Sequence, residues 1–336
     1  MRLVLTSYGT SIRRRETCFL IKQGENFSEI SAKKVEAIII TNAAFLSTDA
    51  IKLAVEHNID IVLLSSSGQP FARIWQPQLG STTLIRRRQL ELTDTPEALS
   101  LIISWVGEKI QNQLTFLQKL QYRRRERLPE LGSKIELLEK YYNNLQPLRG
   151  TIAEHRGTIQ GIEGAAGRCY FNALNLVMPG AYKFDGRSRN PARDPFNCML
   201  NYAYGVLYSM VEKACIISGL DPYIGFMHTD NYNKPSLVLD LIEPLRIYAE
   251  EPIVYLFTGK RIKKDYFTPI RGGVILNREG KKILLERFSQ HMEEPLRFNR
   301  RNVKRKNVIQ YRCQQLVGIL LNKKEDSTEY VDLGDL

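Results

Sequence analysis

The first 75 residues alternate between short apolar runs and turn residues, a pattern that is typical of β-strands. β-Branched and aliphatic residues dominate four of these runs, at residues 2–6, 18–21, 37–41 and 60–64. One helical stretch interrupts them, because Ser47, Thr48 and Asp49 can cap a helix that ends near residue 57. We therefore expect residues 1–76 to form a small β-rich domain.

A helical period replaces this alternation after residue 93. Pro96 and Glu97 are typical of a first helical turn, and apolar residues then recur every three or four positions as far as Leu117. The same period predicts helices over residues 133–146, 155–178, 195–218, 236–248, 279–292 and 302–321. The expected fold class is α+β: a small N-terminal β-sheet domain, a linker at 77–93, a larger, mostly α-helical domain at 94–322, and a disordered acidic tail at 323–336.

The composition is that of an ordinary globular protein. Hydrophobic residues make up 43% of the 336 residues and charged residues 25%. No apolar run approaches the roughly 18 residues that a membrane span requires, and the first residues lack the apolar stretch of a secretory signal. The five cysteines form no CxxC pair. These features predict a reduced, cytoplasmic protein with no membrane partner.

The formal net charge of +12 adds a prediction about partners, because the basic excess is unevenly distributed. Residues 151–322 carry 25 basic and 16 acidic side chains, whereas the last fourteen residues have a net charge of −3. A basic field in the second half predicts a polyanionic partner, nucleic acid before an anionic membrane. The alternative is a charged surface that only maintains solubility.

The sequence lacks the motifs of several large enzyme classes. It contains no GxGxxG after a strand, no GxxxxGK[ST], HExxH or GxSxG, and no Cys-His zinc spacing. ATP-driven, dinucleotide-dependent and zinc-hydrolase activities are therefore disfavoured. What remains as candidate chemistry is a set of polar residues inside otherwise apolar helical sequence.

Four residues make up this candidate set. Glu163 stands among glycines and alanines in residues 161–170, and His228 follows an aromatic, apolar stretch that begins at residue 219. Asp240 and Glu243 are three positions apart in an apolar segment, so on a helix they would share a face. Two buried acids are costly unless they are paired or bind a metal.

Each candidate has a purely structural alternative, since Glu163 could pair with Arg168, His228 could be a buried core residue, and the acids at 240 and 243 could pair with Arg246. Taken together, carboxylates and one imidazole without thiolates suit Mg²⁺ or Mn²⁺. Three protein ligands would leave positions for water and phosphate oxygens, as metal-assisted phosphodiester chemistry requires.

Two basic segments are candidates for contacts with DNA. Arg187 and Arg189 lie in a loop rich in Pro and Gly at residues 185–197, a suitable place to bind phosphates. Arg300 and Arg301 belong to a second basic concentration at residues 297–306, which would follow a DNA backbone without reading bases. The alternative for the second segment is a solvated helix face.

Five segments, taken in order, carry a family resemblance. They read VEAIIITNAAFLSTDAIKLAVEHNIDIVLLSSSGQPFARI, IEGAAGRCYF, RSRNPARDPFNCMLNYAYGVL, GLDPYIGFMH and KPSLVLDLIEPLR. Their order and spacing resemble the CRISPR-associated adaptation integrases, the family of CRISPR-associated protein one. The resemblance extends over about residues 2 to 320. It implies a β-rich N-terminal domain involved in dimerisation and a helical, catalytic C-terminal domain at 94–322.

The same resemblance implies the roles of individual residues. The metal ligands of the family fall on Glu163, His228 and Glu243, and Asp240 corresponds to an acid that supports the site or acts as a base. Lys234 and Arg246 become candidate DNA contacts. The family often has Gly-Arg before the Pro-Ser-Leu run, where this chain has Asn-Lys at 233 and 234.

The resemblance also implies the partners, namely double-stranded DNA, a second copy of the chain, and a small ferredoxin-like subunit, CRISPR-associated protein two, in a heterohexamer. The expected function is a metal-dependent DNA integrase that joins the 3′-hydroxyl ends of captured DNA fragments to a CRISPR repeat by transesterification. One alternative is a metal-dependent endonuclease or junction resolvase that uses water as nucleophile. A second alternative is a DNA-binding scaffold without enzymatic activity.

Overall fold

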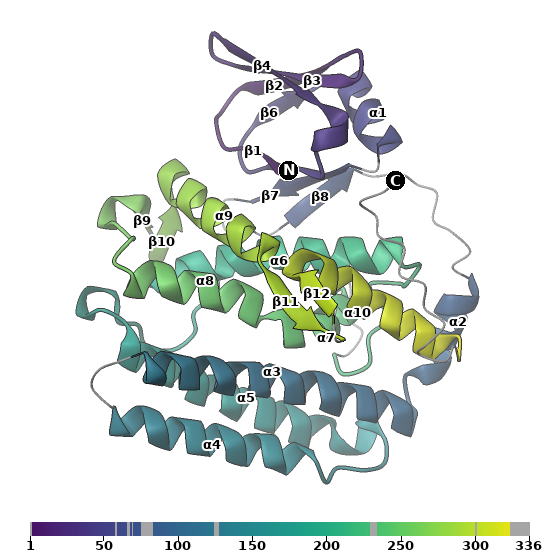
Figure 1. The fold of residues 1–336 in the computed structure, drawn as a ribbon, viewed down its shortest axis with the longest axis vertical. Helices are drawn as coiled ribbons and strands as arrows, with labels where there is room; N and C mark the ends of the chain where they lie inside the picture. Colours follow the sequence, from purple (N-terminus) through teal and green to yellow (C-terminus); the bar gives the residue numbers. More distant parts are fainter. Residues whose placement is uncertain are drawn as a thin grey trace. The chain divides into compact units, whose positions relative to one another are not determined.

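The computed structural model describes residues 2–57, 59–65, 68, 70–74, 83–123, 128–228, 234–299 and 301–322. Strands dominate the N-terminal part of the chain and helices the rest (Figure 1), which confirms the expected α+β fold class. The chain divides into two compact units. Unit 1 comprises Met1–Leu79, Ser188–Ser209 and Ile262–Arg287, and unit 2 comprises Gly80–Arg187, Met210–Arg261 and Phe288–Leu336.

The N-terminal strands of unit 1 form two four-stranded sheets. The elements are β1 (Arg2–Leu5), β2 (Thr10–Arg15), β3 (Cys18–Gln23), β4 (Asn26–Ser31), η1 (Ala32–Lys34), β5 (Ala37–Ile40), β6 (Ala44–Leu46), α1 (Thr48–Glu56), β7 (Asp60–Leu64) and β8 (Pro70–Ile74). One sheet has the order β1-β5-β7-β8, in which only β8 is antiparallel to its neighbour. The other has the order β4-β3-β2-β6, in which only β2 and β6 pair in parallel.

The four apolar runs expected to be strands correspond to β1, β3, β5 and β7. The other four strands of these sheets lie outside these runs, because β2, β4 and β8 are partly polar and β6 has only three residues. In β2, for example, Thr10 and Ile12 are buried while the arginines at 13–15 are exposed. Pairing with β3 on one side and β6 on the other stabilises β2 despite its weak apolar pattern.

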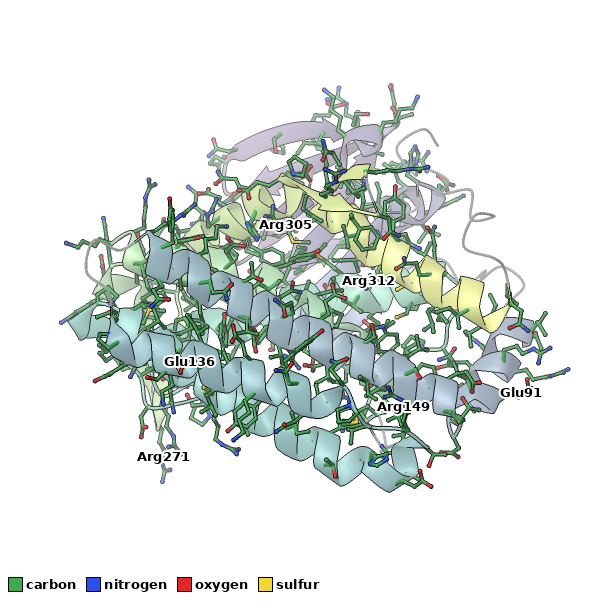
Figure 2. The ribbon with its side chains drawn as sticks, turned by 60° about the horizontal axis from the view of Figure 1, so that its bottom comes forward. Glu91, Glu136, Arg149, Arg271, Arg305 and Arg312 are labelled. Atoms are coloured by element: carbon green, nitrogen blue, oxygen red, sulfur yellow. The ribbon has the colours of Figure 1, made fainter. Side chains whose placement is uncertain are left out.

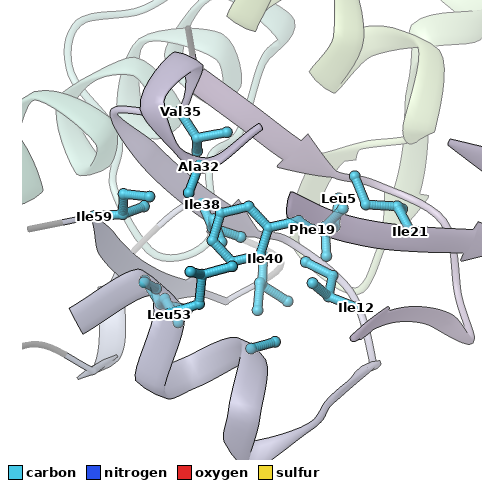
Figure 3. Packing of buried hydrophobic residues seen from close by; sticks show 13 residues of the cluster. Leu5, Ile12, Phe19, Ile21, Ala32, Val35, Ile38, Ile40, Leu53 and Ile59 are labelled. Carbon is cyan, nitrogen blue, oxygen red and sulfur yellow. The ribbon is translucent and has the colours of Figure 1, made fainter. Parts of the chain in front are cut away.

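A hydrophobic cluster joins both sheets and α1 (Figure 3). Ile12 of β2, Phe19 of β3 and Leu53 of α1 are completely buried within it. The expected cap of α1 is present, since the Ser47 hydroxyl accepts a hydrogen bond from the backbone N–H of Ala50 at 3.2 Å. Burial of each large aliphatic side chain stabilises the fold by about 2 kcal/mol, so this cluster holds unit 1 together.

Unit 1 also includes segments from the second half of the chain. They are the first part of α6 (Pro195–Ile217), η4 (Lys264–Tyr266), the hairpin of β9 (Phe267–Ile270) and β10 (Gly273–Leu276), and the first part of α9 (Arg278–Glu293). The two units therefore differ from the sequential blocks expected from the sequence. The division into blocks at 1–76, 77–93 and 94–322, and the dimerisation role of the first block, stay predictions.

Helices dominate unit 2, and every helix expected from the apolar period has a counterpart in the structure. The elements of unit 2 are α2 (Thr83–Leu92), α3 (Pro96–Tyr122), α4 (Pro129–Leu145), α5 (Ile152–Val177), η2 (Gly180–Tyr182), α7 (Ser236–Leu241), η3 (Glu243–Leu245), α8 (Ile247–Thr258), β11 (Pro295–Phe298), β12 (Arg301–Lys304) and α10 (Arg305–Leu320), with the last part of α6 and of α9.

Two of the differences between expected and observed helices have a clear physical cause. The helix expected over 236–248 is divided into α7, η3 and the start of α8, because Pro244 has no N–H to continue the helical hydrogen bonds. The helix expected from residue 302 begins at Arg305, because residues 301–304 pair with β11 as strand β12. A local apolar period contains no information about such strand pairing.

Helices α3, α4 and α5 lie side by side in unit 2 (Figure 1). The Thr95 hydroxyl caps α3 by accepting the N–H of Ala98 at 3.3 Å. The apolar residues expected on one face of α3 are buried, among them Ile102, Val106 and Ile110. In the part of the chain that the structure describes, no helix is both long and apolar enough to cross a membrane.

Helix α2 lies in the segment expected to be a linker. Residues 77–82 of that segment, like the tail at 323–336, are outside the described residues. The side chain of Gln89 on α2 is completely buried. Its amide donates hydrogen bonds to the carbonyls of Asp221 at 2.8 Å and Ile224 at 2.7 Å, and accepts one from the N–H of Asp221 at 3.0 Å. Through these bonds α2 holds the loop that leads to His228.

Replacing Gln89 should therefore destabilise the protein. The change Gln89→Ala removes the partner of three partly buried backbone groups, and we expect it to lower the free energy of unfolding by about 2–4 kcal/mol. Gln160→Ala is the control, because Gln160 is an exposed helical residue, and we expect a change within about 0.5 kcal/mol. Urea unfolding followed by circular dichroism measures both. Equal unfolding midpoints for the two variants would contradict this role of Gln89.

Candidate active site

Asp240 of α7 fixes the segment that carries His228. Its buried carboxylate accepts hydrogen bonds from the N–H groups of Phe226 at 2.7 Å, Met227 at 3.0 Å and His228 at 3.2 Å. The same carboxylate contacts Nδ1 of the His228 ring at 2.6 Å. Because Asp240 occupies Nδ1, Nε2 is the ring nitrogen that is oriented for a metal ion or a proton.

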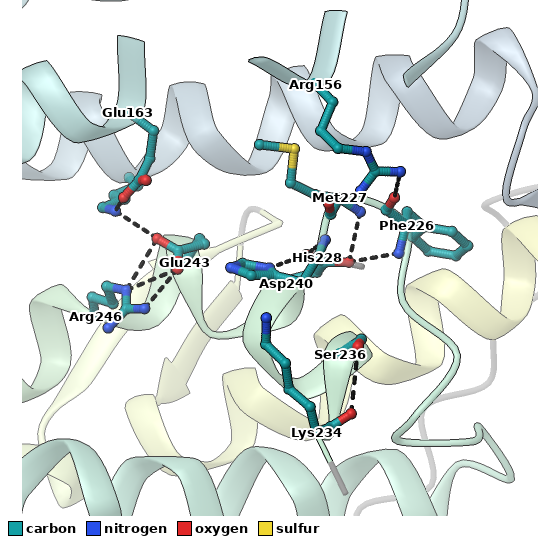
Figure 4. Close-up of polar contacts among 11 residues, drawn as sticks. Arg156, Glu163, Phe226, Met227, His228, Lys234, Ser236, Asp240, Glu243 and Arg246 are labelled. Atoms are coloured by element: carbon teal, nitrogen blue, oxygen red, sulfur yellow. Dashed lines mark hydrogen bonds and ion pairs between the residues drawn. The ribbon is translucent and has the colours of Figure 1, made fainter. Parts of the chain in front are cut away.

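Two further residues hold the same segment from other directions. Arg156 of α5 donates hydrogen bonds to the carbonyls of Met227 and Phe226 (Figure 4). Gly225 lies so close to α7 that a Cβ at this position would be 2.6 Å from the backbone carbon of Ser236. Only glycine permits this approach, which explains why a glycine precedes the apolar residues before His228.

Glu163 and Glu243 meet at a lysine of α3. The ammonium of Lys109 contacts Oε1 of Glu163 and lies 2.6 Å from Oε2 of Glu243. Arg246 holds Glu243 from another side, with Nε 3.0 Å from each carboxylate oxygen and Nη2 2.7 Å from Oε1. Figure 4 shows the Glu163 side chain pointing from α5 toward Glu243. Two carboxylates and two cationic groups therefore form one network.

The charges of this network control the ionisation of its members. Burial alone would raise the pKa of Glu243, but the charges of Arg246 and Lys109 outweigh burial, and the pKa of Glu243 is strongly lowered. Burial alone would lower the pKa of Lys109, but Glu243 and Glu163 outweigh it, and its pKa is raised. Both groups are consequently charged at neutral pH.

The donor set fits the chemistry of Mg²⁺ or Mn²⁺. Glu163 and Glu243 offer carboxylate oxygens, and His228 offers the Nε2 that Asp240 leaves available, an arrangement common around metal-binding histidines. The described residues do not, however, bring three His, Cys, Asp or Glu side chains close enough together to hold an ion. In this structure the oxygens of both glutamates instead contact the Lys109 ammonium.

Of the purely structural pairings expected for the acidic residues, the structure contains some and not others. Glu243 does pair with Arg246, whereas Asp240 pairs with His228. Glu163 pairs with Lys109, while Arg168 is exposed. Asp240 and Glu243 thus belong to two different hydrogen-bond networks, although they are only three residues apart. Whether the predicted ligands bind an ion stays a prediction.

The candidate DNA contacts outside the second basic segment differ in exposure. Lys234 is half-buried and its side chain extends toward His228 in Figure 4. The Arg246 guanidinium forms an ion pair with the Glu243 carboxylate. Arg187 is half-buried, with its guanidinium 5.2 Å from the ring centre of Phe171, and Arg189 is exposed. These positions leave Arg189 the most accessible to a phosphate.

In the second basic segment, several charges are already neutralised. Arg305, labelled in Figure 2, pairs with Glu294 at 3.0 Å. Lys304 and Lys306 both pair with Glu293, at 3.1 and 2.8 Å. Arg301 is exposed at the start of β12, and Arg300 lies outside the described residues. The segment is therefore a hairpin and a helix start with internal ion pairs, and not a single solvated helix face.

Sequence reasoning missed Lys109 and Arg156. Lys109 does have a signal in the sequence, because it falls on the apolar face of α3, one turn from Trp105 and Val106, which are both buried. A lysine in such a position needs an anionic partner. Arg156 has no such signal, since its partners are backbone carbonyls more than sixty residues away in the chain.

Comparison with known proteins gives these features a family context. The family described as CRISPR associated protein Cas1 matches residues 3–290. The chain is 28% identical over 337 residues to the CRISPR-associated endonuclease Cas1 1 of Archaeoglobus fulgidus, and the match covers 96% of this chain and 97% of that protein.

Solved structures show that the fold is shared. A casposase bound to integration product is similar with a TM-score of 0.82 and 22% identity, covering 98% of this chain and 94% of that chain. A chain of the Cas6-RT-Cas1–Cas2 complex is similar with a TM-score of 0.79 and 22% identity, covering 96% of this chain and 35% of that chain. Since the family match includes the segments that carry Glu163, His228, Asp240 and Glu243, this chain belongs to the CRISPR-associated protein Cas1 family.

Proposed function

We propose that this protein is a metal-dependent DNA integrase of CRISPR adaptation. The 3′-hydroxyl of a captured DNA fragment attacks a phosphodiester at the border of a CRISPR repeat. One phosphorus–oxygen bond forms to the fragment, one breaks in the repeat strand, and a 3′-hydroxyl is released. Because one bond replaces another, no ATP is needed, in agreement with the absence of a P-loop motif.

The observation that carries this proposal is the orientation of His228 by the buried carboxylate of Asp240, within a chain of the Cas1 family. Glu163, His228 and Glu243 are the residues that would hold Mg²⁺ or Mn²⁺. When bound, the ion supplies positive charge that polarises the attacked phosphate and stabilises the leaving oxygen. Asp240 keeps the His228 ring in one orientation and one tautomer, as carboxylates do for other metal-binding histidines.

Double-stranded DNA is the proposed substrate, and the basic second half of the chain supports it. Arg187, Arg189, Lys234, Arg300 and Arg301 are proposed to contact phosphates. Arg246 is proposed to act both on DNA and on Glu243, whose carboxylate it orients through two hydrogen-bonding nitrogens. Such contacts position the backbone and do not select a base sequence.

The proposed assembly is a homodimer, two copies of which are bridged by the small ferredoxin-like subunit Cas2 into a heterohexamer. The similarity to a chain of the Cas6-RT-Cas1–Cas2 complex supports Cas2 as partner. The proposed location is the cytoplasm, where the chromosomal repeat is accessible.

An endonuclease that uses water as nucleophile is the second candidate, because the relative from Archaeoglobus fulgidus is named an endonuclease. The same residues would serve either nucleophile. The structure of a casposase bound to integration product favours the 3′-hydroxyl. A scaffold without activity is the weakest candidate, because it gives no role to the Asp240–His228 pair.

Strand joining tests the proposed reaction. The protein, its Cas2 partner and Mn²⁺ are incubated with a short DNA duplex and a supercoiled plasmid that carries the repeat. We expect joined products for the wild type, a loss of more than about 100-fold for His228→Ala, and loss of joining with a chelator. His57→Ala is the control, because the His57 ring contacts the Leu53 carbonyl of the preceding helix turn at 3.1 Å and has no part in the proposed site, and it should join at the wild-type rate.

Other products would lead to other conclusions. Cutting of the plasmid without joining, in the presence of Cas2, would favour the endonuclease. Metal-independent DNA binding with no strand chemistry under any condition would contradict both enzymatic proposals and favour the scaffold.

Asp240→Asn tests the orientation of His228. The amide cannot accept from three N–H groups and the ring as the carboxylate does, so we expect strand joining and Mn²⁺ affinity to fall about 10- to 100-fold. Asp265→Asn, at an exposed position, should change neither. Isothermal titration calorimetry measures the affinity, and unchanged Mn²⁺ binding by Asp240→Asn would show that the Asp240 contact does not orient a metal ligand.

A further inference from the structure

We propose that the Lys109 ammonium occupies the cation position between Glu163 and Glu243 when no metal is bound, and that a divalent ion must displace it. This inference rests on the metal site of the proposed function and deepens it. It makes Lys109 an internal competitor that sets the metal affinity of the site. No metal ion is needed, on this proposal, to hold the two carboxylates together.

The contacts of Lys109 are the first support. Its side chain is only 7% exposed, yet its Nζ reaches carboxylate oxygens from two different elements, Glu163 of α5 and Glu243 of η3. A buried ammonium that bridges two carboxylates makes the same kind of contact as a divalent ion between hard oxygen ligands. These are two of the oxygen donors that the proposed metal would use.

The balance of charge is the second support. Among the described residues, Arg246 would be the one cation left beside Glu163 and Glu243 without Lys109, and like charges in a partly buried site repel. With Lys109 present, the two carboxylates are matched by two cations. The network is therefore complete without a metal, which agrees with the lack of a three-ligand metal cluster among the described residues.

Displacement of Lys109 is structurally feasible. The ammonium stands at the end of a flexible four-carbon chain, so it can leave the carboxylate oxygens by rotation about its side-chain bonds. The backbone of α3 can stay fixed, because Trp105, Val106 and Ile110 anchor it on either side of Lys109. The free energy of removing Lys109 from the carboxylates reduces the apparent affinity for the incoming ion.

Lys109→Met separates the two roles of this residue. Methionine preserves much of the apolar stem and removes the charge. We expect the metal-free variant to melt at a lower temperature than the wild type, and we expect it to bind Mn²⁺ about five- to tenfold more tightly, because no ammonium has to be displaced. Differential scanning calorimetry in chelator and isothermal titration with Mn²⁺ alone, both on the full chain, measure these changes.

Lys119→Met is the matched control on the same helix. Lys119 pairs with Glu251 at 2.8 Å, and its side chain is 45% exposed, so its loss should leave the Mn²⁺ affinity unchanged and the melting temperature close to that of the wild type. Should Lys109→Met fail to fold, Lys109→Gln serves the same purpose, because its amide can donate a hydrogen bond to a carboxylate but carries no charge. It should also bind Mn²⁺ more tightly than the wild type.

The outcomes distinguish this inference from the proposed function. If the wild type binds Mn²⁺, His228→Ala does not, and the Lys109 variant binds with unchanged or weaker affinity, the inference is wrong and the metal site stands. If neither the wild type nor the Lys109 variant binds Mn²⁺, the metal site of the proposed function is wrong and the inference fails with it. Tighter Mn²⁺ binding by the Lys109 variant than by the wild type, with unchanged binding by Lys119→Met, supports both the inference and the metal site.

Discussion

The carboxylate of Asp240 is the constraint on which the rest of the site depends. It is buried, and it takes up the three consecutive N–H groups of residues 226–228 together with Nδ1 of His228. A charge in such a position is stable only because every hydrogen-bonding direction is used. The contacts of Arg156 and Gln89 then hold the same loop from α5 and α2. The imidazole is thus oriented before any ligand arrives.

The second feature is a balance of charge around Glu243. Lys109 and Arg246 keep this buried carboxylate ionised, and Lys109 extends the network to Glu163. The carboxylates of Glu163 and Glu243 are neutralised by neighbouring cations, so the site is stable in the folded protein without a bound ion. The same arrangement implies a cost for binding one. On our proposal, stability of the metal-free fold and affinity for the metal oppose each other at one lysine, Lys109.

Much of the fold could be predicted from the sequence because local patterns encode it. Apolar alternation identified β1, β3, β5 and β7, and the helical period identified the buried face of α3. Strands such as β2 and β12 were not predicted, because their stability comes from pairing with other strands and not from their own apolar pattern. The same limit explains the missed helix α2, whose buried Gln89 binds a loop 132 residues away.

The sequence by itself determined the types of most elements, because these depend on local periodicity. It also determined the family and the order of Glu163, His228, Asp240 and Glu243, because these depend on motifs at set spacings. Only the tertiary structure decided which of these groups are partners. It joined Asp240 to His228 and placed Lys109 between Glu163 and Glu243. Lys109 and Glu163 are 54 residues apart, and long-range packing of α3 against α5 brings their charges together.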